Sequence, residues 1–123
     1  MREDTMAKIL IADDSAFARL NCKKVLTRGG HDVLEAASGF EALAIYKSER
    51  PDVVFLDITM PDMDGLAALE EIIKFDAEAR IAMATAMGQQ RIVIEALKAG
   101  AKEFLVKPFQ PERVLTTVDK LLA

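Results

Sequence analysis

The chain has 123 residues and a formal net charge of −4, and 51% of its residues are hydrophobic. A chain of this length suits one domain with its own core. The acidic balance gives no electrostatic case for binding nucleic acid, which would call for a basic face. No apolar run approaches the ~20 residues that cross a membrane. We therefore expect a cytoplasmic protein that contacts neither nucleic acid nor membrane.

Residues 1–6 are mostly charged or polar and lack the apolar stretch of a signal peptide. We expect them to be a short extension ahead of a single domain over residues 7–123. The one cysteine, Cys22, excludes an internal disulfide, and it is expected to pack as a small hydrophobe. The one histidine, His31, follows two glycines and is expected at the surface, so we predict no zinc site.

Five short apolar runs predict β-strands. In chain order they span residues 9–12, 33–36, 53–56, 81–84 and 104–106. Strands that are buried on both faces read as continuous apolar runs rather than alternating ones, as most of these do. The run at 33–36 is less uniformly apolar than the others. We therefore expect it at an edge of the sheet, and 53–56 at the centre.

A helical pattern follows each run. The first begins at Ser15, a favoured N-cap, and has apolar residues at helical spacing that include Phe17, Leu20 and Val25. Ser38 and Glu41 match a capping box at the start of the second helix. After the turn-rich segment 59–65, four apolar residues recur on one helical face: Leu66, Leu69, Ile72 and Ile73.

The last two helices carry their own stop and start signals. The fourth pattern ends at Gly100, and Pro111 suits the first turn of the fifth helix. The buried stripe of that helix is predicted to consist of Val114, Leu115, Val118, Leu121 and Leu122. Strand and helix thus alternate five times, which predicts a three-layer, doubly wound α/β fold around a parallel sheet. The chain contains no linker-like tract, so we expect a stand-alone domain.

Four of the apolar runs end on polar residues that phosphoryl chemistry can use. These residues are Asp13-Asp14, Asp57, Thr85 and Lys107-Pro108. Open α/β sheets bind ligands in the crevice outside the carboxyl ends of their strands. Three acids, a hydroxyl and an amine would meet there, which predicts a metal-assisted phosphate site.

Three carboxylates in one cleft repel one another. Two charges 4 Å apart cost roughly 4 kcal/mol at an effective dielectric constant near 20. A divalent cation would compensate, because Mg²⁺ takes oxygen ligands and is usually held by one or two carboxylates plus a phosphate; Mn²⁺ is the alternative. Lys107 supplies a further positive charge. Asp57 is the best nucleophile candidate, and Asp13 and Asp14 are better suited as metal ligands.

This set of residues, in this order and on these strand ends, resembles the receiver domain of two-component response regulators. Residues 60–65 also match the Met-Pro-x-x-x-Gly loop of that family. The resemblance implies the flavodoxin-like, CheY-like fold with strand order 2-1-3-4-5. Residues 86–90 and 98–101 are most similar to chemotaxis-type CheY proteins.

By this resemblance, Asp57 accepts a phosphoryl group from a histidine kinase or a histidine phosphotransfer domain. Asp14, Asp57 and the backbone carbonyl of Thr59 would bind Mg²⁺ directly, and Asp13 would bind it through water. The protein would catalyse its own phosphorylation and dephosphorylation without being an enzyme in the usual sense.

The resemblance also implies a switch. Lys107 would pair with the phosphoryl group, and Thr85 would move to hydrogen-bond it. Phe104 would turn inward in response, in a position where many relatives carry Tyr. The surface formed by the fourth helix, fifth strand and fifth helix would then control a partner protein, a flagellar switch or another effector. We expect a monomer, with Lys107-Pro108 in the cis form that proline makes accessible.

Three other classes of protein share parts of this pattern. A flavodoxin-type FMN carrier shares the fold, but Asp13-Asp14 would repel its phosphate. A haloacid-dehalogenase-like phosphatase uses an Asp-x-Asp-Gly motif, which residues 62–65 mimic, yet that motif should directly follow an apolar strand. A pseudo-receiver adaptor that is never phosphorylated would not need the complete acid set or Lys107.

Two positions tune phosphate lifetime in the family, and they correspond to Thr59 and Met87 here. A methionine side chain hydrogen-bonds an attacking water poorly, so we expect slower self-dephosphorylation than in relatives with a charged residue there. A Met87→Glu variant should therefore lose phosphate from Asp57 at a different rate from the parent, measured by the decay of the phosphorylated form. Equal rates in the two proteins would contradict this.

Overall fold

The computed structural model describes residues 7–86 and 89–123 as alternating strands and helices around one parallel sheet. The strands are β1 (Lys8–Ala12), β2 (Asp32–Ala36), β3 (Val53–Asp57), β4 (Ile81–Thr85) and β5 (Glu103–Val106). The helices are α1 (Ala16–Arg28), α2 (Gly39–Glu49), α3 (Gly65–Phe75), α4 (Gln90–Ala99) and α5 (Pro111–Leu122). None of these described helices has the length and apolar character needed to span a bilayer.

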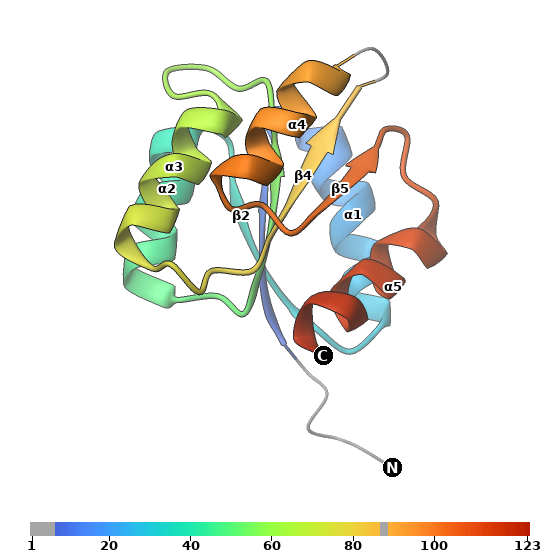
Figure 1. Cartoon of the computed structure of the whole chain (residues 1–123). Coiled ribbons are helices and arrows are strands. Elements are labelled where there is room, and N and C mark those ends of the chain that lie inside the picture. Colours follow the sequence, from blue (N-terminus) through green and yellow to red (C-terminus); the bar gives the residue numbers. More distant parts are fainter. Residues whose placement is uncertain (1–6, 87–88) are drawn as a thin grey trace.

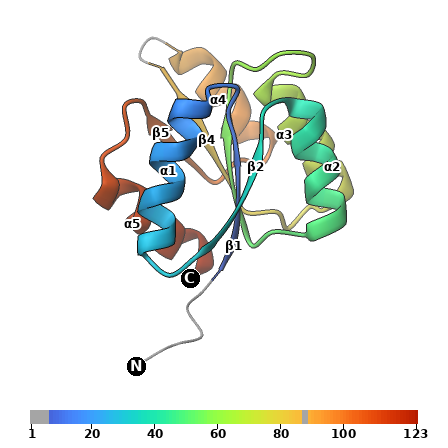
Figure 2. The same cartoon turned by 180° about the vertical axis from the view of Figure 1, so that it is seen from behind.

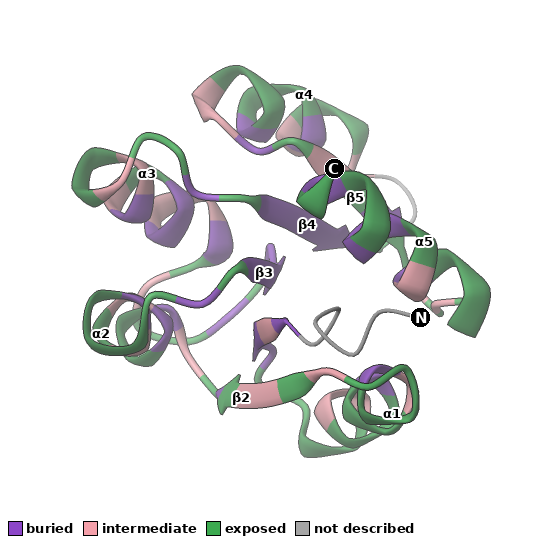
Figure 3. Ribbon diagram, turned by 90° about the horizontal axis from the view of Figure 1, so that it is seen from below, coloured by how far each residue is buried: buried purple, intermediate pink, exposed green. Residues whose placement is uncertain are grey.

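The strand order is β2-β1-β3-β4-β5, with every neighbouring pair parallel. The helices α1 and α5 cover one face of the sheet, and α2, α3 and α4 cover the other (Figures 1 and 3). This confirms the predicted doubly wound fold, with β2 at an edge and β3 at the centre. Figure 3 shows β3 and β4 buried, whereas the edge strand β2 is largely half-exposed.

Two hydrophobic cores lie on opposite faces of the sheet, because successive strand residues point to opposite sides. Ile9 and Phe55 pack under α1 and α5 with Leu26 and Val118. The other core, under α2, α3 and α4, is larger and contains Leu10, Leu56, Leu69, Ile72 and Met83. Burial on both faces explains why the strands read as continuous apolar runs in the sequence.

The predicted caps form with one change. Ser15 Oγ accepts a hydrogen bond from the Ala18 N–H at the start of α1, and Pro111 is the first residue of α5. Ser38 Oγ accepts a hydrogen bond from the Glu41 N–H. The Glu41 carboxylate reaches back to the N–H of Ala37 rather than to that of Ser38, so this capping box closes one residue earlier than expected.

Two of the apolar residues at helical spacing on α1 lie on its exposed face. Phe17 and Leu20 are 73% and 47% exposed, and α1 buries Cys22 and Leu26 instead. The predicted burial of Cys22 is confirmed, and burial, together with the charge of Asp13, raises the pKa of its thiol to about 12. A thiol with such a pKa is inert at neutral pH.

Two further positions differ in detail. His31 is half-buried rather than fully at the surface, and its Nδ1 accepts a hydrogen bond from the Ala7 N–H at 3.1 Å. This bond ties the end of the α1–β2 turn to the start of β1. Leu122, predicted in the buried stripe of α5, is 37% exposed because it lies at the helix end.

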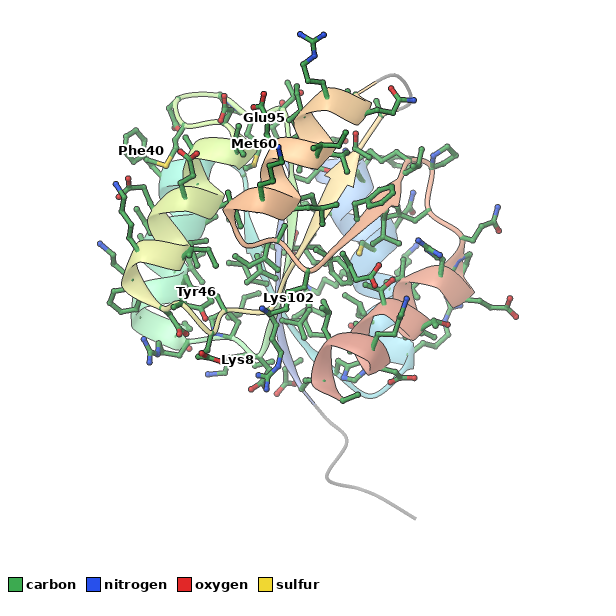
Figure 4. The ribbon with its side chains drawn as sticks, viewed as in Figure 1. Lys8, Phe40, Tyr46, Met60, Glu95 and Lys102 are labelled. Carbon is green, nitrogen blue, oxygen red and sulfur yellow. The ribbon has the colours of Figure 1, made fainter. Side chains whose placement is uncertain are left out.

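All five strands run in the same direction, so the loops that follow them gather at one end of the molecule (Figures 1 and 2). Figure 4 shows Met60, in the loop after β3, at this end, while Lys8 at the start of β1 lies at the opposite end. The sheet therefore brings the residues after β1, β3, β4 and β5 together at the carboxyl ends of the strands.

Gly65 holds the loop after β3 close to the strand it follows. Its N–H donates to the carbonyl of Ile58 at 2.7 Å. A Cβ added at Gly65 would lie 2.0 Å from the backbone oxygen of Asp57. Only glycine allows this approach, so α3 begins directly beside the end of β3 that carries Asp57.

Replacing Gly65 with Ala should lower the free energy of unfolding by roughly 1–3 kcal/mol, because the new methyl group must displace backbone. Urea denaturation of the parent and the variant measures this loss. Gly30→Ala gives the cost of a positive φ without a steric contact, since its φ is +91° and an added Cβ meets nothing within 4 Å. A Gly65→Ala variant as stable as the parent would contradict the close approach.

Candidate phosphate and metal site

Asp13 follows β1 and is held in place from three sides. Its N–H donates to the carbonyl of Ala36 at 3.0 Å, which extends the ladder to β2. Its Oδ1 accepts a hydrogen bond from the Ser15 N–H at 2.9 Å, and its carbonyl accepts one from Arg19 Nη1 at 2.6 Å. The residue is only 4% exposed. Asp13 is therefore a buried acid whose position is set by backbone contacts.

Asp57 is the last residue of β3, at the centre of the sheet, and it is 8% exposed. Burial raises the pKa of its carboxyl; the hydrogen bond and charge of Lys107 oppose this rise, whereas the charge of Asp13 adds to it. A raised pKa means that the ionised form of Asp57 destabilises the folded state in the absence of further positive charge.

Lys107 bridges these two acids. Its Nζ lies 2.7 Å from Asp13 Oδ2 and 3.0 Å from Asp57 Oδ2. Burial opposes its charge, but the hydrogen bonds to both carboxylates raise the pKa of Lys107 above its usual value. The Lys107 N–H donates to the carbonyl of Thr85 at 2.8 Å, and the peptide bond to Pro108 is cis, as predicted. The ammonium group is thus fixed in its charged form between two strand ends.

Asp14 completes a cluster of three carboxylates. One oxygen from each of Asp13, Asp14 and Asp57 lies within 4.8 Å of the others. Within residues 7–86 and 89–123, the ammonium group of Lys107 is the one cation bonded to these carboxylates, which leaves an excess of negative charge. All-oxygen donors in such a cluster suit a hard divalent cation such as Mg²⁺. The residues predicted as metal ligands therefore fit that ion by donor type and spacing.

Thr59, whose carbonyl was predicted as a metal ligand, is exposed in the loop after β3. Its backbone hydrogen bond to the Asp57 carboxyl opposes the rise in the pKa of that group. The role of its carbonyl stays a prediction. Met87, predicted to affect phosphate lifetime, and the predicted extension at 1–6 lie outside the described residues.

Thr85 ends β4 next to the acids, because Asp57 pairs with the preceding residue, Ala84, in the sheet register. It is 2% exposed. Its Oγ1 lies 3.0 Å from the carbonyl oxygen of Ala86 and 2.9 Å from Gln89 Oε1. The hydroxyl is therefore engaged by the loop that leads into α4.

Phe104 lies on β5, the strand at the sheet edge beside α4. It is 36% exposed, so it faces outward rather than into the core. A groove of ≈ 510 Å³ lies between α4 and β5, and its walls include Val93, Ile94, Leu97, Phe104 and Val106. Thr85 and Gln89 line the same groove, so it extends to the residues that border the acid cluster.

The two acids of the Asp-x-Asp-Gly segment have structural partners. Asp64 Oδ1 accepts a hydrogen bond from the Ala67 N–H and caps α3. Asp62 adopts a left-handed conformation with φ of 58°, and its Oδ1 accepts a hydrogen bond from the Met63 N–H. These contacts explain the motif as loop architecture and give no support to the phosphatase reading.

The sequence reading missed Gln89 and Arg19. Gln89 binds the hydroxyl of Thr85, and Arg19 links the carbonyl of Asp13 to the Glu35 carboxylate, 3.0 Å from its Nε. Gln89 lies in the segment 86–90 that is similar to CheY proteins, but that similarity assigned it no contact, and Arg19 belongs to no recognisable motif. Gln89 directly precedes the fourth helix, and Arg19 lies in the first turn of the first helix. These positions do not predict the contacts that the two side chains make.

The comparisons with known proteins agree with this geometry. A family model described as the response regulator receiver domain matches residues 9–119. The chain belongs to the response regulator receiver domain family. The predicted resemblance to CheY-type proteins is confirmed as well.

Several CheY proteins are similar to this receiver over nearly its whole length. It is 53% identical over 116 residues to the chemotaxis protein CheY of Bacillus subtilis, covering 94% of this chain and 97% of the relative. It is 51% identical over 115 residues to the chemotaxis protein CheY of Thermotoga maritima, covering 93% and 96%. A crystal structure of a CheX–CheY–BeF3–Mg complex from Borrelia burgdorferi matches with a TM-score of 0.89 at 39% identity, over 94% of this chain and 89% of that one.

Adding Mg²⁺ should stabilise the receiver, because a cation that binds only the folded state relieves repulsion among the three acids. At a concentration 100 times Kd, the free energy of unfolding should rise by about 2.7 kcal/mol, measured by urea denaturation with and without the metal. Asp14→Asn should reduce this gain. Asp119→Asn, which removes an exposed acid on α5, should keep it; a loss of the gain in that variant would point to binding elsewhere.

Proposed function

We propose that this receiver takes a phosphoryl group onto Asp57 from a phosphohistidine of a kinase or a phosphotransfer domain. One observation carries the proposal: the carboxylate of Asp57, at the end of the central strand, lies 3.0 Å from the Lys107 ammonium and within a three-acid cluster. Buried acids crowded at a sheet edge are costly unless the site uses them. The similarity to CheY proteins supports the same role.

The transfer exchanges one bond for another. A carboxylate oxygen of Asp57 forms a P–O bond as the P–N bond of phosphohistidine breaks, and the imidazole leaves with the electron pair of that bond. Bound Mg²⁺ would supply positive charge that offsets the negative charge of the phosphoryl oxygens. The transition state is loose, with charge spread over three oxygens, so the protein contributes mainly position and electrostatic stabilisation.

Each described residue of the site has a task in this scheme. Asp14, Asp57 and the carbonyl of Thr59 would hold the cation directly, and Asp13 would hold it through water. Lys107, already charged and bonded to Asp57, donates to a phosphoryl oxygen. The similar CheY of Borrelia burgdorferi was solved in a complex with CheX, BeF3 and Mg, which supports a role for a divalent cation here.

Phosphorylation would act on the surface formed by α4, β5 and α5. The modification adds up to two negative charges, and the Thr85 hydroxyl turns towards them. Phe104, which faces outward beside the groove between α4 and β5, then turns inward and changes the shape of the groove wall. The free energy released by these contacts biases a two-state equilibrium between the two forms of the surface.

The partners follow from the same resemblance. A cytoplasmic histidine kinase or phosphotransfer domain supplies the phosphoryl group, and a flagellar switch or another effector reads the surface. The relatives named for chemotaxis support that pathway. The receiver acts as a monomer and catalyses only its own phosphorylation and dephosphorylation. Phe104 keeps the packing of a tyrosine but lacks its hydroxyl, so no partner contact is made through that hydroxyl.

A pseudo-receiver that never carries phosphate is the remaining alternative. Such an adaptor would not need to keep Lys107 charged between two buried acids. The pseudo-receiver alternative makes a different prediction: the protein should bind its partner equally well with and without phosphoryl donors.

The receiver incubated with Mg²⁺ and a small acyl phosphate should gain one phosphoryl group, measured as an increase in intact mass. Asp57→Asn should abolish the gain, because an amide is a poor nucleophile. Asp62→Asn, which changes an acid in the neighbouring loop, should leave it unchanged. Labelling that persists in Asp57→Asn would move the acceptor elsewhere, and no labelling of the parent would favour the adaptor.

A further inference from the structure

We propose that Gln89 is a positioning residue, whose side-chain amide holds Thr85 in its unphosphorylated arrangement and so opposes activation. The proposal rests on the proposed function, in which Thr85 turns towards a phosphoryl group on Asp57. It adds a residue outside the acid cluster that sets how readily this turn occurs.

Gln89 makes two hydrogen bonds to the end of β4. Its Oε1 accepts from Thr85 Oγ1 at 2.9 Å and from the Ala86 N–H at 2.7 Å. The backbone N–H of Ala86 can only donate, so it identifies the contacting atom of the amide as oxygen. The same oxygen is placed to accept from the Thr85 hydroxyl at 2.9 Å. The amide group thus holds a side chain and a backbone group together.

Gln89 does not serve its own helix. It immediately precedes α4, in the position where a capping side chain would accept a hydrogen bond from the first turn. Its side chain makes no such capping bond. The amide is directed back to β4 instead, which is unusual for a residue at a helix start. Its contact with Thr85 is therefore not a by-product of capping.

The burial of Thr85 gives this contact its effect. The residue is 2% exposed, and a buried hydroxyl that loses its partners is unfavourable. It has one proton, which Ala86 O and Gln89 Oε1 are both placed to accept. Turning towards Asp57 breaks the bond to Gln89, so the amide stabilises the resting arrangement relative to the turned one.

The Gln89 side chain also lies where loss of its bond to Thr85 would change the partner-facing groove. Gln89 and Thr85 line the groove between α4 and β5, together with Phe104. When Thr85 leaves, the Gln89 side chain loses one of its two partners on the wall of that groove. A single residue then connects the state of the hydroxyl to the surface that a partner protein contacts.

The test uses Gln89→Ala and measures the affinity of the full chain for beryllofluoride in the presence of Mg²⁺ by NMR titration. Loss of one net hydrogen bond in the resting form should tighten apparent binding by about three- to tenfold. Gln89→Glu keeps an acceptor oxygen and should bind more like the parent. Gln90→Ala, one position further on and exposed, should match the parent. Equal affinities for the parent and Gln89→Ala would overturn the proposal.

A second measurement needs no phosphate mimic. Ala86 is exposed, yet its N–H is bonded to Gln89, so its hydrogen exchange in the resting parent should be slowed. Gln89→Ala should remove that protection, whereas Gln90→Ala should keep it. An unprotected Ala86 amide in the parent would overturn the proposal even if the protein binds beryllofluoride. A parent that shows this protection but never binds beryllofluoride would instead contradict the proposed function of Asp57.

Discussion

The Lys107 ammonium between Asp13 and Asp57 is the interaction on which the site depends. Two buried carboxylates repel each other strongly in a medium of reduced dielectric constant. A single ammonium group at 2.7 and 3.0 Å offsets much of that repulsion. With Asp14 added, negative charge is still in excess, so the carboxyl ends of the strands attract further cations. The same field that makes the acids costly thus makes them suited to a divalent ion.

The fold holds these charges together through backbone contacts. The N–H of Asp13 extends the hydrogen-bond ladder between β1 and β2, and the N–H of Lys107 extends the ladder between β5 and β4 by donating to Thr85. Gly65 allows the loop after β3 to lie against the end of that strand. The two cores bury both faces of the central strands, so the strand ends have little freedom to separate. Charge repulsion at the edge is therefore opposed by burial along the length of the sheet.

The fold and the acid cluster were predictable from sequence because both rest on strand ends. Continuous apolar runs mark buried parallel strands, and the residue after each run, such as Asp57, reaches the same edge. Side-chain contacts between elements carry no such periodic signal. The exposure of Phe17 depends on how α1 is rotated against the sheet, and the bond from Gln89 to Thr85 depends on a loop conformation. Both are tertiary properties that local patterns do not specify.

Communication from the site to the outer surface needs no long chain of residues. Thr85 borders the acid cluster through the register of β3 and β4, and it also lines the groove beside Phe104. In the proposed function, a movement of its hydroxyl would change both places at once. Because β5 is the edge strand, a side chain such as Phe104 can change its exposure without disturbing the two cores. In the proposed function, the edge strand β5, separated from the central strand β3 only by β4, would therefore let a local change in charge alter a partner surface while the sheet stays fixed.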